Sequence, residues 1–189
     1  MPAILLSAPL AEPLSLDEAR AFLRVEHHDD DETIAALVAG ARLHVEAQTR
    51  RALITQSWRL TLDAWPDDGR VAVRPAPLRA LTAARVYDAD GNSAPLDTQS
   101  FVLDLGASAL AFMAWALPQP GRSAAGIELD VSVGYGDSAR DVPEPLRQAV
   151  RLLVAHWYEN RGLAAVGHEV NVLPATVAAL LAPYRMLSL

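Results

Sequence analysis

The chain has 189 residues, of which 51% are hydrophobic and 21% charged, a balance typical of a folded protein with its own core and not of a disordered one. It contains no cysteine, which excludes disulfides, thiol catalysis and cysteine-ligated metal sites. The formal charge is −7, and the 16 basic residues are all arginines scattered singly, so no basic stripe for tracking phosphates is present.

The first residues carry no targeting signal of the usual kind. Residues 1–14 have no basic segment before an apolar stretch, so we do not interpret them as an export signal. The most apolar run, residues 109–117, is far shorter than the roughly 20 residues that span a bilayer. We therefore expect a cytoplasmic origin and no membrane partner.

Two helices are predicted first. Ser15 is followed three residues later by Glu18, which is the pattern of a helix N-cap with a reciprocal carboxylate, and a short helix is expected to run to about Val25. A second helix is predicted from apolar residues that recur at helical spacing, namely Ile34, Leu37, Val38, Ala41 and Val45. The acidic residues just before it would lie at the positive end of the helix dipole.

From Gln56 the period changes to two. Trp58, Leu60 and Leu62 alternate with polar residues, as in a half-buried strand. Further short strands are predicted around residues 70–74, 81–87, 101–105, 109–117 and 127–135, and Asp90-Gly91 is typical of a tight hairpin turn. Residues 56–136 are therefore expected to form an antiparallel β module of about six strands.

The helical period returns after Pro143 and Pro145, which are tolerated in a first helical turn. One apolar face of residues 144–161 is formed by Leu146, Val150, Leu153 and Trp157. A last short helix is expected from about Pro174 to Leu181 and ends before Pro183, which leaves an apolar terminal stretch, YRMLSL, better buried in a partner than exposed.

These elements predict an α+β fold: a small helical bundle built from the N- and C-terminal helices, with an inserted antiparallel β module. The helical domain would comprise residues 1–55 and 137–189, and the β module residues 56–136. Each outer segment has one apolar stripe and is too short to be stable alone, so we expect the two segments to bury those stripes against each other.

The densest group of possible metal ligands is His27, His28, Asp29, Asp30, Asp31 and Glu32. It lacks the alternating spacing, turn glycine and terminal glutamate of a calcium loop, so a solvated helix N-terminus is the favoured interpretation over a metal site.

Acid–base chemistry is conceivable around His156, Glu159 and Arg161, but no partner group is identifiable elsewhere. The tryptophans at 58, 65, 115 and 157 are interpreted as packing residues and not as a platform for nucleic-acid bases. We therefore expect no catalytic residue, no bound metal and no cofactor. A small metal-dependent enzyme remains the least favoured alternative.

The order of the segments resembles the head-tail connector, or adaptor, family of tailed phages, in the longer type found in prophages and gene transfer agents. The matching stretches are collinear and cover most of the chain: SLDEARAFLRV, DDDETIAALVAGARLHVEAQTRRAL, QSWRLTLDAWP, VAVRPAPLRALTAARVYDADG, VSVGYGDSARDVPEPLRQAVRLLVAHWYENR and LPATVAALLAPYR. The long β insertion departs from the shortest, all-helical members.

The resemblance implies a structural virion protein at the head-tail interface and not an enzyme. It would form a homo-oligomeric ring, a dodecamer, between the portal protein and the tail stopper or completion protein. Double-stranded DNA would pass through the channel without sequence-specific binding. Another tail-completion or stopper protein of the virion is the alternative.

The resemblance also implies where partners would bind. The C-terminal segment of such connectors reaches toward the portal, and the portal or ring contacts expected on this basis are Trp157, Tyr158, Arg161, Pro174, Leu180, Leu181, Tyr184 and Arg185.

Overall fold

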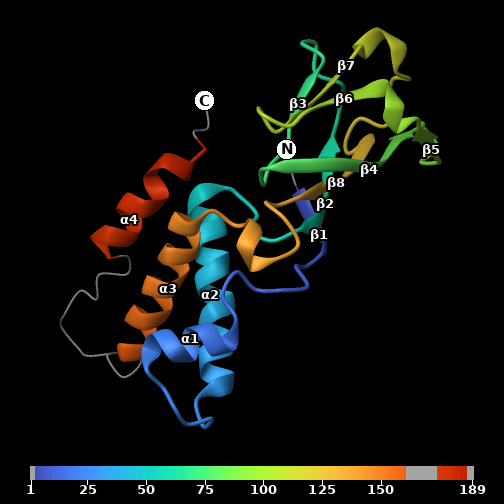
Figure 1. Ribbon diagram of the computed structural model, residues 1–189. Coiled ribbons are helices and arrows are strands. Elements are labelled where there is room, and N and C mark those ends of the chain that lie inside the picture. Colours follow the sequence, from blue (N-terminus) through green and yellow to red (C-terminus); the bar gives the residue numbers. More distant parts are fainter. Residues whose placement is uncertain (1–2, 161–173, 187–189) are drawn as a thin grey trace, which may run out of the picture. The chain divides into compact units, whose positions relative to one another are not determined.

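The computed structural model describes residues 3–160 and 174–186, and these form two compact units (Figure 1). Unit 1 comprises Met1–Pro9 and Thr55–Gly134, and unit 2 comprises Leu10–Ile54 and Tyr135–Leu189. Unit 1 is built from two antiparallel sheets and unit 2 from helices, which confirms the predicted α+β class. Within the described residues, no helix is long and apolar enough to cross a membrane.

The helices of unit 2 are α1 (Leu16–Leu23), α2 (Asp31–Thr49), α3 (Glu144–Glu159) and α4 (Ala175–Leu181), with the 3-10 turns η3 (Ala139–Asp141) and η4 (Ala182–Tyr184). The predicted cap of α1 is confirmed: the Ser15 hydroxyl accepts a hydrogen bond from the Glu18 amide, and the Glu18 carboxylate accepts one from the Ser15 amide. These bonds satisfy amides that a helix start otherwise leaves without partners.

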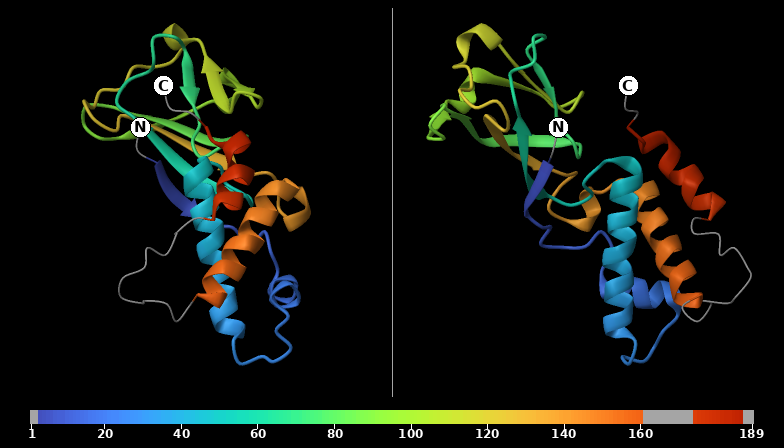
Figure 2. Two further views of the ribbon diagram at one scale, coloured as in Figure 1. Left: turned by 90° about the vertical axis from the view of Figure 1, so that its left-hand side faces the viewer. Right: turned by 180° about the vertical axis from the view of Figure 1, so that it is seen from behind.

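Unit 2 encloses one hydrophobic core. Helices α2 and α3 lie side by side, α1 contacts both of them, and α4 packs against α3 (Figure 2). The predicted apolar stripes face this core, since Ile34 and Val38 of α2 and Leu146 and Leu153 of α3 are 0–2% exposed. The two outer segments therefore bury their stripes against each other, as expected from their lengths.

The strands of unit 1 are β1 (Ala3–Ser7), β2 (Gln56–Leu62), β3 (Arg70–Ala72), β4 (Leu78–Tyr87), β5 (Ser93–Leu96), β6 (Phe101–Asp104), β7 (Ala109–Phe112) and β8 (Ile127–Val133), with 3-10 turns η1 (Thr98–Ser100) and η2 (Ala114–Ala116). One sheet has the order β1-β2-β8-β4-β5, and the other has the order β3-β7-β6.

The alternation in β2 and β8 sorts their side chains between the two faces of the five-stranded sheet. Leu60 of β2 lies opposite Leu129 of β8, and both are 0% exposed, whereas Arg59 lies opposite Asp130 on the other face. The three-stranded sheet contributes a second apolar layer around Trp65, whose ring centroid lies 4.9 Å from that of Phe112. The β module thus has a core of its own.

The structure differs from the prediction at both edges of the larger sheet. Residues 1–9, expected in the helical part, group with unit 1 because Ala3–Ser7 pairs antiparallel with β2. Strand β5 was also not predicted, and it follows the predicted Asp90-Gly91 turn. The strand expected over 109–117 ends at Phe112, because the chain turns into η2.

Candidate assembly surface

Of the contact residues predicted from the family resemblance, the described ones lie in unit 2, at the end of α3 and in the segment from Pro174 to Arg185. Arg161 lies outside the described residues. Pro174 is the half-buried N-cap of α4, and its carbonyl accepts a hydrogen bond from the Val177 amide at 2.9 Å.

Two aromatic residues fasten the end of α3 to α2. The ring of Trp157 meets that of His44 edge-on, with centroids 6.0 Å apart, and an added side chain at Gly40 would lie 3.6 Å from the same indole. The Tyr158 hydroxyl donates to the Asp30 carboxylate at 2.5 Å. Both residues are half-buried, so each packs partly inside unit 2 and keeps part of its surface exposed.

Helix α4 presents a buried face and a surface face. Leu181 and Val177 are 0% exposed, so in this conformation the Leu181 side chain supports the core and does not reach a partner. Leu180 and Tyr184 are half-buried and pack against the same core, whereas Arg185 is exposed. Of the predicted contacts on α4, η4 and the residue that follows, Leu180, Tyr184 and Arg185 therefore keep surface that a partner could touch.

The terminal segment is held against the end of α2 as far as Met186, whereas the sequence predicted burial of this stretch in a partner. The guanidinium of Arg51 donates to the Tyr184 carbonyl at 2.8 Å, and the Met186 amide donates to the Thr49 carbonyl at 3.2 Å. Arg51 also interacts with the hydroxyl of Tyr135, and burial raises the pKa of this phenol despite the nearby cation. Arg51 was not singled out from the sequence, since its partners are distant in the chain.

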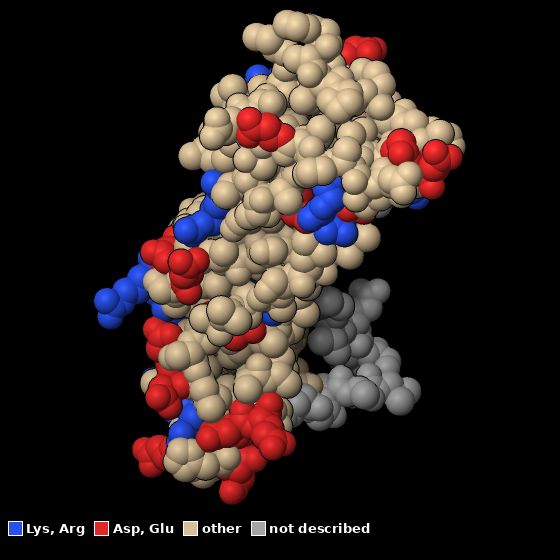
Figure 3. All heavy atoms as spheres, turned by 90° about the vertical axis from the view of Figure 1, so that its right-hand side faces the viewer, with Lys and Arg blue, Asp and Glu red and all other residues tan. Residues whose placement is uncertain are grey.

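The acidic stretch before α2 forms a charged helix start. The carboxylate of Asp31 is paired with two side chains. It lies 3.4 Å from Nε of Arg20 and 2.9 Å from Nδ1 of His28. Glu26, Asp29 and Glu32 are exposed, and Figure 3 shows acidic side chains gathered at this end of unit 2. Within the described ranges, no three histidines or carboxylates are arranged to hold a metal ion.

Of the residues considered for acid–base chemistry, the two that the structure describes, His156 and Glu159, lack the geometry of a catalytic pair. The amide nitrogen of Asn160 lies 3.3 Å from Nδ1 of His156, and Glu159 is exposed to solvent. Nε2 of His156 is buried and has no hydrogen-bond partner among the residues that the structure describes. A nucleophile or carboxylate poised against this imidazole is therefore not found in that part of the chain.

A second group of charged residues lies in unit 1, on the polar face of the five-stranded sheet. Asp130 accepts from Arg59 at 2.7 and 2.9 Å and from Arg85 at 2.9 Å, and Glu128 lies 3.2 Å from Arg59. The hydrogen bonds from Arg59 hold the pKa of Asp130 below its ordinary value. The two arginines and two carboxylates pair with one another across β2, β8 and β4, so the charges of this network are balanced within the sheet.

The tryptophans do not all pack as predicted. Trp65 is buried and its indole donates to the Pro118 carbonyl at 2.9 Å, which agrees with a core role. Trp115 is 84% exposed in η2, so its interpretation as a packing residue was wrong. Residues close to Trp115 in the sequence, Met113 and Ala116, line an apolar groove formed by β6, β7 and η2.

No protein-family model matches the chain, and no curated protein matches it significantly. Among solved structures, the neck of an empty GTA particle computed with C6 symmetry contains a chain 28% identical to this one, with a TM-score of 0.83 and coverage of 100% of this chain and 97% of that chain.

Two further structures give the same picture. The virion of a native gene transfer agent (GTA) particle matches with a TM-score of 0.80, and the neck of a native GTA particle computed with C12 symmetry matches with a TM-score of 0.79. Both are 28% identical and cover 100% of this chain and 97% of the other chain. This similarity across both units confirms the resemblance of the chain to neck proteins of gene transfer agent particles, which is consistent with a head-tail connector.

Proposed function

We propose that the chain is a structural subunit of the neck of a tailed-phage-like particle or gene transfer agent, forming a connector ring between the portal and the tail. The observation that carries the proposal is similarity over the full length to a neck chain: both units match, at 28% identity and a TM-score of 0.83. A shared fold alone does not imply a shared function, but two differently built units conserved in one order make a common role the simplest explanation.

A ring of twelve copies fits the C12 symmetry of one of the similar necks. Each copy carries a formal charge of −7, so the ring has a strongly negative field. Such a field repels the phosphates of double-stranded DNA and lets it slide through a channel without sticking. The ring would extend the DNA channel of the portal and give the stopper or completion protein of the tail a surface to bind.

The side chains that first suggested chemistry support a structural role and not an enzymatic one. Asp31 is paired with Arg20, Tyr158 donates to Asp30, and Trp157 packs on α2. Because these groups are engaged in holding helices together, the protein is proposed to act without a cofactor. A stopper or other tail-completion protein is the second candidate, because another similar neck structure was computed with C6 symmetry.

The deciding experiment is electron microscopy of particles from cells that produce an affinity-tagged copy of the chain. The proposal predicts a ring of twelve tagged subunits directly beneath the portal, and tail-less heads when the gene is deleted. Six copies farther from the head would favour the stopper assignment. Particles that lack the tagged chain would refute both.

Unit 2 is proposed to contact the portal through the surface that Leu180, Tyr184 and Arg185 form. Arg185→Ala is expected to weaken capture of the portal protein, because this exposed cation is held only loosely, 3.2 Å from Gln48. Arg140→Ala is the matched control, since Arg140 is also exposed in unit 2 but lies on η3. Equal capture by the two variants would place the portal contact elsewhere.

A further inference from the structure

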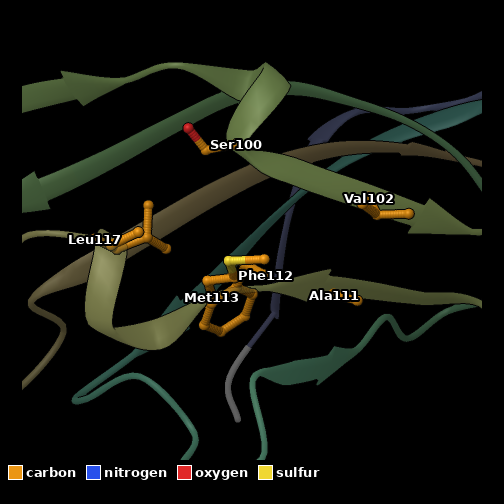
Figure 4. Close-up of a pocket in the computed structure, with 7 residues that line it drawn as sticks. Ser100, Val102, Ala111, Phe112, Met113 and Leu117 are labelled. Atoms are coloured by element: carbon orange, nitrogen blue, oxygen red, sulfur yellow. The ribbon is translucent and has the colours of Figure 1, made fainter.

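Unit 1 has an apolar groove on its three-stranded sheet. The groove has a volume of about 440 Å³, and its lining includes Val102, Phe112, Met113 and Leu117, with Ser100 as the most polar member (Figure 4). Val102 and Met113 are 68% and 64% exposed, so the walls stand open to solvent. A surface of this kind is costly to leave in water and is typical of a binding site.

The groove is preformed. Phe112 belongs to a cluster in which its ring centroid lies 4.9 Å from that of Trp65 and 5.6 Å from that of Phe101. Trp65 is in turn fixed by its hydrogen bond to the Pro118 carbonyl, just beyond η2. An occupant therefore meets a rigid floor and loses little free energy to ordering it.

The same unit has an uncovered apolar strand. Ile4, Leu5 and Leu6 of β1 are 56%, 45% and 46% exposed, and among the described strands only β2 pairs with β1. Sheet edges are normally protected by charge, proline or short length. The opposite edge, β5, has four residues and contains Pro95, whereas β1 has neither charge nor proline. The edge of β1 is thus suited to being covered by another chain.

Charge and symmetry indicate what covers each surface. Identical copies with a charge of −7 repel one another, so they associate most readily through patches without charge, and β1 and the lining of the groove have none. A closed ring is made of head-to-tail contacts, which need two different, complementary patches on each subunit. Strands β1 and β7 belong to different sheets of unit 1, so β1 and the groove are two separate patches.

We infer that β1 of one copy packs its apolar side chains into the β6–β7–η2 groove of a second copy, and that this contact builds the ring. The inference rests on the proposed ring function. In this contact Trp115, which is 84% exposed beside the groove, packs against the incoming β1 strand of the neighbouring copy. It also gives β1, which is exposed along its whole length, a partner within the assembly.

Because the chain has no cysteine, engineered pairs give a clean test. Leu5→Cys and Met113→Cys are combined in one full-length chain, and assembled particles or the concentrated protein are treated with a flexible bismaleimide. The inference predicts a ladder of covalent multimers. The control pair Leu5→Cys and Ala89→Cys, with its second cysteine in the exposed β4–β5 turn, is expected to give none beyond dimers.

Mixing separates a head-to-tail contact from a two-fold one. Chains with only Leu5→Cys and chains with only Met113→Cys should remain uncrosslinked alone and yield a dimer with one copy of each when mixed. In addition, Met113→Glu should weaken the association by about tenfold or more, because its carboxylate would be buried without a partner.

The outcomes distinguish this inference from the function on which it rests. Twelve-membered rings that contain the double-cysteine chain but give no more multimers than the control pair would overturn the β1-to-groove contact and leave the connector role intact. Particles that lack the chain altogether would refute the connector role, and the inference with it.

Discussion

Asp130 is the residue whose replacement tests the account of unit 1 most directly. The side chain of Asp130 is 10% exposed, and its carboxylate accepts three hydrogen bonds, two from Arg59 and one from Arg85. Asparagine keeps one acceptor oxygen and turns an NH₂ group toward the guanidinium ions, so one or two charged bonds are lost. Each is worth about 1.5–3 kcal/mol.

Two effects moderate this loss. The side chains of Arg59 and Arg85 are 27% and 31% exposed, so water solvates them in part, and Glu128 stays within 3.4 Å of both. We therefore expect Asp130→Asn to lower the free energy of unfolding of unit 1 by about 2–3 kcal/mol at pH 7. Amides of β8 that exchange by unfolding of the unit should exchange roughly 30- to 150-fold faster.

The difference between wild type and variant should depend on pH. The folded-state pKa of Asp130 lies below its ordinary value of 3.8, chiefly because of the hydrogen bonds from Arg59. The stabilisation is then complete above the unfolded-state pKa and is lost as the pH falls through the lower, folded-state value. The stabilities of wild type and Asp130→Asn should therefore begin to converge as the pH falls below 3.8 and meet only below the lower, folded-state pKa.

Amide exchange followed by mass spectrometry measures this effect in each unit separately. Asp88→Asn is the matched control, since Asp88 also accepts hydrogen bonds, from Asn92, but lies in an exposed turn of the same unit. If the two variants exchange alike in β8 at neutral pH, the charged network does not stabilise the sheet and the reasoning is refuted.

Three further substitutions test other parts of the fold. Arg51→Met should remove about 1–3 kcal/mol of local stability and so accelerate amide exchange at residues 182–186. Arg50→Met, at an exposed position, should leave this exchange rate unchanged. Leu153→Ala should cost about 2–5 kcal/mol in urea unfolding of unit 2, because its side chain is 0% exposed in the core. Gly69→Ala should cost more than Gly91→Ala on thermal unfolding: both glycines have positive φ, but an added Cβ at Gly69 would lie 2.4 Å from the Phe112 carbonyl oxygen and one at Gly91 would meet nothing.

Elements that are determined by residues close together in the chain could be predicted from the sequence. The cap of α1 follows from Ser15 and Glu18, and the four-three-four spacing of Leu146, Val150, Leu153 and Trp157 predicts α3. The cap succeeds because its hydrogen bonds are local, and the apolar spacing succeeds because burial of one helix face determines it. Strand β1 has no such pattern: its five residues are exposed on both sides, and only pairing with β2, more than fifty residues later, makes it a strand.

The surfaces were harder to predict for the same reason. The family resemblance indicated the segment that contains Tyr184 and Arg185, but not that Arg51, separated from Tyr184 by 133 residues, holds it. Trp115 was interpreted as a core residue because large aromatics usually pack, and nothing adjacent in sequence shows that the chain turns outward after Phe112. Exposure is a tertiary property, so a single sequence does not determine it.

The interruption of unit 2 by unit 1 has a consequence for biosynthesis. Helix α2 ends at Thr49, and its principal neighbour α3 begins at Glu144, so on the ribosome the strands of unit 1 have all been made before α3 exists. The sheets are therefore expected to fold first, at a stage when the apolar stripe of α2 is not yet covered by α3. During that interval the stripe is exposed and prone to aggregate, and slow translation after Gly134 would lengthen the exposure.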